Sequence, residues 1–271
     1  GMGSQFSENT FYTNKGFSSY NGLLATLHKN IGYGLQFDLN YTWSHSIDNV
    51  SLIANAAAYG GYGFICDILR PRECRGNSDF NVNQYFNGNF IYDLPVGKGK
   101  MIASGAPRWL DEIVGGWSVS GLPYVHGGNV YFAGANAFVA GYANNAPAVL
   151  VGPPSDLKIH INGGQGQPLL AYANPAQANA DYTGPVGFNI GSRNNLIGPS
   201  YFNMDMGLAK GFPVTEQVIV KFRADAFNVF NHPDFNAPCT DITNSGGCQF
   251  GTITGTANGA RVLQGSLRVE F

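Results

Sequence analysis

The feature that most constrains the fold is a strict alternation of apolar and polar residues over Ile31–Trp43. Every second side chain in this stretch is apolar, and the residues between them are glycine or polar. Successive side chains of a β-strand point to opposite faces, so the pattern predicts a strand with one apolar and one polar face. The stretch is longer than the roughly 5–6 residues usual in soluble proteins and suits a tilted membrane strand of about 9–11 residues.

The same alternation recurs along the chain, whereas helical periodicity is nearly absent. We expect strands at Leu23–Lys29, Ile31–Trp43, Tyr85–Leu94, Gly116–Val125, Phe202–Leu208, Val218–Ala226 and Leu263–Phe271. Pro123 weakens the fourth of these as a central strand. An eighth strand at about Gln5–Thr13 has poor alternation. The sequence therefore predicts an all-β protein, an antiparallel up-and-down meander of about seven to eight long strands.

The connections between these strands alternate between short and long. Tight turns are expected around Asn30 and around Gly211-Phe212-Pro213, whereas long irregular loops are expected at about 46–82, 131–200 and 229–260. Long loops on one side and short turns on the other are typical of an outer-membrane β-barrel. We divide the chain into an N-terminal extension at 1–18 and a β-barrel segment at 19–271. The extension begins with Gly1 before Met2, which resembles a cloning or protease-cleavage scar.

The composition fits such a barrel. Charged residues make up 12% of the chain, against about 25% in average soluble domains, while glycine (37 residues) and aromatic residues (13%) are plentiful. The formal net charge is -2, which argues against a nucleic-acid partner because such proteins need a basic face. The sequence contains no apolar run of about 18 residues, so no transmembrane helix is expected; alternating membrane strands would escape that criterion.

The four cysteines form two local pairs, Cys66 with Cys74 and Cys239 with Cys248, both in loops rich in glycine and asparagine. Neither pair has the spacing or the neighbouring histidines of a zinc site. We predict two short-range disulfides, formed in an oxidising compartment at one end of the sheet. The alternative is four free thiols in a reducing compartment.

The sequence suggests no catalytic or metal site. No nucleophile elbow and no metal-binding histidine motif occurs, and Asp67, Glu73 and Asp79 lack the spacing of a calcium loop. Asp111-Glu112 beside Trp109 is expected to be a solvated pair in a turn. We therefore expect no enzymatic activity, no metal and no cofactor, and the sequence assigns no ligand-binding residue.

Several longer motifs carry a resemblance to a known family. They are Tyr20–Leu23 (YNGL), Gly34–Phe37 (GLQF), Tyr41–Asn49 (YTWSHSIDN), Ile91–Lys100 (IYDLPVGKGK), Gly115–Gly121 (GGWSVSG) and Arg223–Pro233 (RADAFNVFNHP). In combination they resemble the C-terminal part of the barrel of TonB-dependent outer-membrane receptors, in particular the Oar-like group that carries a carboxypeptidase-regulatory-like domain. The resemblance covers about Tyr20 to Phe271.

The resemblance implies a Gram-negative outer membrane, energised uptake of a bulky solute and a barrel of many strands. Nothing in the chain resembles a plug domain or a TonB box. The expected role is therefore that of a barrel segment that contributes pore wall and extracellular ligand-contact loops. Its expected partners are outer-membrane lipid and the barrel assembly machinery, together with the receptor's N-terminal strands and plug or other copies of the chain.

Two sets of residues follow from this interpretation. The final strand resembles the assembly signal of outer-membrane barrels, with alternating residues and a terminal aromatic at Gly265, Leu267, Val269 and Phe271. The polar faces of the strands are expected to line the lumen through Gln36, Asp38, Asn40, Lys221, Arg223, Asp225, Arg268 and Glu270. Arg223 and Arg268 should therefore lie on one side of the sheet, where opposite charges pair across strands.

Two other functions remain open at this point. The chain could be a structural, filament-forming extracellular protein that self-associates through its strands, or a secreted β-sandwich that binds glycans. Seven strands place the two ends of the meander on opposite sides, whereas bacterial barrels normally have an even count. We therefore predict that the first and last strands are open edges that seek partners, in a receptor, an oligomer or a filament.

Overall fold

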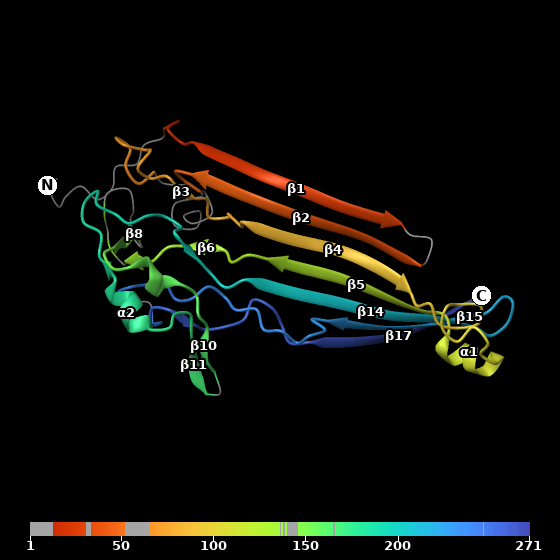
Figure 1. Cartoon of the computed structure of the whole chain (residues 1–271). Helices are drawn as coiled ribbons and strands as arrows, with labels where there is room; N and C mark the ends of the chain where they lie inside the picture. Colours follow the sequence, from red (N-terminus) through yellow and green to blue (C-terminus); the bar gives the residue numbers. More distant parts are fainter. Residues whose placement is uncertain are drawn as a thin grey trace.

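A computed structural model describes residues 13–30, 34–51, 65–135, 137, 139, 146–164, 166–245 and 247–271. Its dominant feature is one antiparallel sheet in which all seven predicted long strands are present in chain order (Figure 1). They are β1 (Ser18–Asn30), β2 (Leu35–Asp48), β4 (Gln84–Asp93), β5 (Trp117–His126), β14 (Tyr201–Pro213), β15 (Ile219–Phe227) and β17 (Val262–Glu270). A short strand, β3 (Gly76–Asn77), pairs with the end of β2. The predicted meander is therefore confirmed.

Of the two predicted tight turns, the second is displaced. At the first, β1 continues through Asn30, which pairs with Gln36, and residues 31–33 lie outside the described residues. Gly211, Phe212 and Pro213 belong to β14, and Pro213 pairs with Ile219. Proline is tolerated at the end of a strand, and the real turn is closed by Thr215, whose hydroxyl accepts from the N–H groups of Gln217 and Val218.

β5 pairs with a strand on each side despite Pro123, but the proline coincides with an interruption in one of the two ladders. Pro123 pairs with Met204 of β14 on one side. On the other side, the ladder to β4 runs from Asn87–Tyr124 directly to Phe90–Gly121 in the same register, without pairing in between. Proline has no N–H to donate, so the interruption falls where it is expected. The predicted weakness is thus local.

The two ends of the sheet differ strongly. At one end β14 and β15 are joined by a short turn, while the connection from β4 to β5 holds helix α1 (Arg108–Val114), beside which the C-terminus lies (Figure 1). Asp111 and Glu112 therefore lie on a helix; the expected turn was wrong. The helix is held by Lys210, whose ammonium donates to the carbonyls of Ile113 at 2.9 Å and Gly115 at 2.6 Å, because the last carbonyls of a helix lack internal partners.

At the other end, the long connections fold over the strand ends into what we call the cap, the described residues of 49–83, 127–200 and 228–261 (Figure 1). The cap holds η2 (Pro154–Leu157) and α2 (Pro175–Ala180). Its short strands are β6 (Val130–Tyr131), β7 (Gly134–Ala135), β8 (Ala146–Pro147), β9 (Val149–Leu150), β10 (Asn162–Gly164), β11 (Gln167–Leu170), β12 (Tyr182–Thr183), β13 (Leu196–Ile197) and β16 (Thr252–Ile253).

The buried apolar core lies in the cap and not on the sheet. Tyr172 and Phe250 are fully buried and stack with ring centroids 5.5 Å apart, and Tyr182 packs against Phe250 edge-on. By contrast, every residue of β1 is exposed. Since neither buried apolar cluster includes a residue of the long strands, the large sheet is stabilised mainly by its hydrogen-bonded ladders.

β1 and β17 are the two outer strands of the sheet. In the part of the chain that the structure describes, β1 pairs only with β2 and β17 only with β15, so each has one unpaired edge. The prediction of open edges is confirmed. Among the same residues, no helix is long and apolar enough to cross a membrane.

Central strands approach closely where glycine is present, and this gives a stability prediction. A Cβ added at Gly121 would lie 2.3 Å from the Phe90 ring and 3.0 Å from the Met204 methyl group, whereas one added at Gly211 meets only Ile219 at 3.5 Å. We expect Gly121→Val to destabilise the folded chain by about 1–3 kcal/mol through overpacking.

The matched control is Gly211→Val, for which we expect a change below about 1 kcal/mol. Urea unfolding in detergent, followed by tryptophan fluorescence, compares the two variants. Equal effects of the two substitutions would contradict the packing that the register implies.

Candidate functional site: the polar sheet face and its cap

The strand register gives the large sheet two chemically different faces. Phe37 of β2 stands opposite Phe90 of β4, which stands opposite Gly121 of β5. On the other face, Asn40 stands opposite Asn87, and Asn87 opposite Tyr124. Directly opposed residues of antiparallel strands share a face. The alternation seen in the sequence is therefore kept in register across the sheet.

The apolar face carries large exposed side chains. Trp43, Leu263, Leu267 and Val269 lie on it, and each is more than half exposed. Gly265, Leu267 and Val269 stand opposite Ala224, Phe222 and Val220, while Phe271 follows the end of β17 and is fully exposed. The structure thus puts the three strand residues of the expected assembly signal on the apolar face; the signal itself remains a prediction.

The opposite face holds all the residues predicted to line a lumen. The register places on this one face Gln36, Asp38, Asn40, Lys221, Arg223, Asp225, Arg268 and Glu270. Asn40 donates to Asn87 at 3.3 Å and accepts from the Thr26 hydroxyl at 3.0 Å, and Asp38 pairs with His28. We call this surface the polar face; that it lines a lumen stays a prediction.

Charged side chains on the polar face form ion pairs both between neighbouring strands and within one strand. Lys221 stands opposite Arg268 and forms a cross-strand ion pair with Glu270, 2.7 Å from Nζ to Oε2. Arg223 instead pairs within its own strand with Asp225 at 2.8 Å. Arg223 lies two residues from Lys221, so Arg223 and Arg268 are on the same side of the sheet, as predicted.

The end of the polar face that is nearest to the cap carries a cluster of aromatic rings. Tyr85, His126 and Tyr201 are directly paired on three neighbouring strands. The His126 ring is parallel to both tyrosine rings, with centroid distances of 6.3 Å to Tyr85 and 5.1 Å to Tyr201. Tyr124 lies edge-on to all three rings. The sequence did not single out this cluster, although pairing of the predicted strands would have brought it together.

An open pocket lies beside this cluster, at the interruption of the β4–β5 ladder. Its volume is about 440 Å³, within the roughly 300–1,000 Å³ typical of small-molecule sites. Its lining includes Asn87, Leu122, Tyr124, Tyr201, Asn203 and Asp205. The Asp205 carboxylate accepts from the Asn203 amide at 3.0 Å and from the Asn228 N–H at 2.8 Å, so the pocket wall is tied to the cap.

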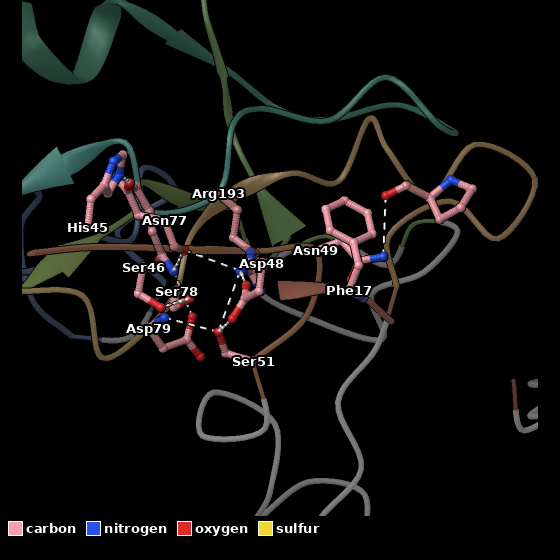
Figure 2. Close-up of polar contacts among 12 residues, drawn as sticks. Phe17, His45, Ser46, Asp48, Asn49, Ser51, Asn77, Ser78, Asp79 and Arg193 are labelled. Atoms are coloured by element: carbon pink, nitrogen blue, oxygen red, sulfur yellow. Dashed lines mark hydrogen bonds and ion pairs between the residues drawn. The ribbon is translucent and has the colours of Figure 1, made fainter. Parts of the chain in front are cut away.

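A buried polar network joins the end of β2 to the cap (Figure 2). Asp48 forms an ion pair with Arg193, and both side chains are nine-tenths or more buried. The Ser51 hydroxyl donates to Asp48 at 2.7 Å, and Arg193 also donates to the Asn77 carbonyl at 3.2 Å. Asp48 is the last but one residue of the family-like motif Tyr41–Asn49, so the end of that motif takes part in seating the cap. The partner Arg193 was not predicted, because nothing local marks it.

Both predicted disulfides are present in the cap. The sulfur atoms are 2.05 Å apart in Cys66–Cys74 and 1.92 Å apart in Cys239–Cys248. Inside the first loop, burial acts to raise the pKa of Asp67, but hydrogen bonds from the N–H groups of Leu69 and Arg70 and the Arg70 guanidinium outweigh it, so the pKa is lowered. Asp67 therefore closes a turn, and no cluster of three metal-ligating side chains occurs among the described residues.

The cap core is also rich in buried phenols. The hydroxyl groups of Tyr131 and Tyr172 are hydrogen-bonded at 2.7 Å. Burial raises the pKa of Tyr131, and neighbouring Tyr172 adds to the effect; burial likewise raises the pKa of Tyr172 and Tyr182. These phenols stay neutral at physiological pH, which suits a structural role.

Comparison with known proteins decides the family. A family model described as an outer membrane beta barrel domain matches residues 2–264, nearly the whole chain. The chain belongs to this family. No curated protein and no solved structure matches it.

Membership in the outer membrane beta barrel family places the sheet in the bacterial outer membrane. The protein is an outer-membrane barrel protein of bacteria, and its surroundings include lipid. The seven long strands form a single sheet, so the secreted β-sandwich considered above is not the fold.

The buried ion pair gives a second prediction. We expect Asp48→Asn to destabilise the cap by about 3–5 kcal/mol, because the Arg193 guanidinium would remain buried without its counter-charge. Limited proteolysis of intact outer membranes should then cut the cap faster than in wild type.

The matched control is Arg108→Gln, which removes the exposed ion pair with Glu112 on α1. Exposed pairs contribute about 0–1 kcal/mol, so the control should leave proteolysis unchanged. Wild-type proteolysis rates in Asp48→Asn would contradict a seating role for the pair.

A third prediction concerns the disulfides. Each closes a loop with a sequence separation of 8 or 9 residues, for which the chain-entropy account gives about 2–3 kcal/mol. We expect Cys239→Ala/Cys248→Ala to lower the free energy of cap unfolding by that amount, measured by thermal unfolding in detergent. An unchanged unfolding midpoint would contradict this prediction.

Proposed function

We propose that this chain forms part of the pore wall and the extracellular ligand-contact surface of a TonB-dependent outer-membrane receptor. The observation that carries the proposal is the division of one large sheet into an apolar face and a polar face, with a disulfide-bonded cap at one end of the strands. In a barrel, the apolar face contacts lipid and the polar face lines the interior. The motif resemblance supports the TonB-dependent class.

The unpaired edges of β1 and β17 fit this role. Unpaired N–H and C=O groups are costly in hydrocarbon, so an edge strand in a membrane needs a partner strand. We propose that further strands of the receptor pair with both edges and close the wall. The final strand, with its apolar residues and terminal Phe271, would be recognised by the barrel assembly machinery, as the resemblance implies.

The cap fits a ligand-contact surface. It is held by two disulfides and by the Asp48–Arg193 pair, and Asn228 of the cap donates its N–H to Asp205 in the wall of the pocket. Rigid positioning of loops on a scaffold is a common way to present ligand-contact residues. We propose a binding and transport role without enzymatic activity.

The test compares two neighbouring residues of β15 that point to opposite faces. In the host bacterium, Lys221→Cys and Val220→Cys are each labelled with a bulky, membrane-impermeant maleimide. The native cysteines are in disulfides and should not react. Uptake is measured for the solute whose accumulation falls when the gene is deleted, with and without a protonophore.

The proposal expects that the protonophore abolishes uptake and that labelling blocks uptake in Lys221→Cys while Val220→Cys keeps wild-type uptake. Uptake that is independent of the proton gradient would reject the TonB-dependent class. Equal labelling at both positions would reject the pore-wall role and favour the extracellular filament.

A further inference from the structure

The pocket on the polar face lies where the β4–β5 ladder is interrupted, and the interruption creates its floor. Pro123 donates no N–H there, and no pairing joins Gly88 and Asn89 to Pro123 and Leu122. Asn87, Tyr124 and Asn203 form a continuous row across the sheet immediately beside this point. The pocket is therefore built into the strands themselves and does not depend on one loose loop.

The polar groups of the pocket are only partly used by the protein. Among the described residues, both hydrogen bonds that reach Asp205 end on Oδ1, which leaves Oδ2 available as an acceptor. His126 donates from Nδ1 to the Gly127 carbonyl, so Nε2 of the neutral ring is an acceptor. Asn203 donates its amide to Asp205 and retains its carbonyl oxygen. The three residues that carry these atoms, His126, Asn203 and Asp205, all line the one pocket.

Apolar surface lies beside these atoms. Leu122 is 56% exposed although it lies on the polar face, directly opposite Asp205. The Tyr124 ring stands next to it, two residues along the same strand, and is set crosswise to the stacked rings of Tyr85, His126 and Tyr201. The pocket thus pairs a small apolar patch with several hydrogen-bonding groups of mostly neutral character.

We propose that this pocket is a binding subsite for neutral oligosaccharides. A sugar ring presents an apolar C–H face, which suits Leu122 and Tyr124, and a rim of hydroxyl groups that both donate and accept hydrogen bonds. Those hydroxyls match Oδ2 of Asp205, the Asn203 carbonyl and the His126 ring nitrogen. The subsite names a substrate class for the receptor proposed above and rests on that proposal for its place in a pore.

Charged ligands fit the pocket less well. Among the described residues, no lysine or arginine lines it, and Asp205 would repel an anion. A quaternary ammonium ion needs open ring faces around one point. Here Tyr85, His126 and Tyr201 stack on one another, so their inner faces are covered.

The experiment measures binding of sugars to the purified full chain by isothermal titration calorimetry, in a detergent without a sugar headgroup. The probes are neutral hexasaccharides of glucose, xylose and mannose, with citrate as the anion and choline as the cation. We expect at least one hexasaccharide to bind and neither charged probe to compete. Tyr124→Ala and Asp205→Asn should each weaken binding about tenfold or more.

Two further variants serve as a second test of the pocket and as a negative control. Leu122→Ser changes an exposed side chain, leaves the ring cluster intact and should also weaken binding, which covers the case in which Tyr124→Ala does not fold. Tyr41→Ala removes a partly exposed tyrosine from the apolar face and should bind like wild type. Binding by none of the hexasaccharides, equal binding by all variants, or preference for choline or citrate would each overturn the proposal.

The outcome is separable from that of the proposed function. A chain whose Lys221→Cys label blocks gradient-driven uptake, but which binds no neutral sugar, retains the receptor role and loses the subsite. A chain that binds sugars through Tyr124 and Asp205, but whose two β15 positions label equally, keeps the subsite and loses the pore.

Discussion

Inter-strand backbone hydrogen bonding in one fixed register is the constraint on which the rest of this structure depends. Hydrocarbon offers no hydrogen bonds, so a membrane strand must satisfy its N–H and C=O groups on neighbouring strands. The register of that ladder also determines which side chains lie on each face of the sheet, because a shift of one residue would exchange the two faces of a strand. Phe37, Phe90 and Gly121 stay on one side, and Asn40, Asn87 and Tyr124 on the other, only while the register holds.

Departures from the regular ladder are where the molecule gains specific features. The edges of β1 and β17 create a need for partner strands. The break at Pro123 opens a pocket on the polar face. At the end of β2, the strand gives way to a buried polar network in which Asp48 and Arg193 hold the cap in place. Regular pairing thus builds the sheet, and the local irregularities are the places where we propose that a ligand or a partner strand binds.

Much of the sheet could be predicted because period-two alternation is a local signal. All seven strands and both disulfides followed from patterns within short segments. Strand ends were less accurate: Pro213 carries a turn signal, yet it ends β14 because Thr215 provides the turn. The Asp48–Arg193 pair spans 145 residues and Lys210 reaches α1 across 95 to 97 residues, so no local pattern could reveal them. The pocket needed the exact register of β4, β5 and β14, which alternation alone does not determine.

The most direct test of this account is a spin-label scan along β15 in lipid bilayers, with accessibility to oxygen and to a water-soluble nickel complex measured at each position. The account predicts a two-residue oscillation, with oxygen maxima at Val220, Phe222 and Ala224 and nickel maxima at Lys221, Arg223 and Asp225. Accessibility without this alternation, or with the two sets exchanged, would contradict a sheet whose apolar face meets lipid.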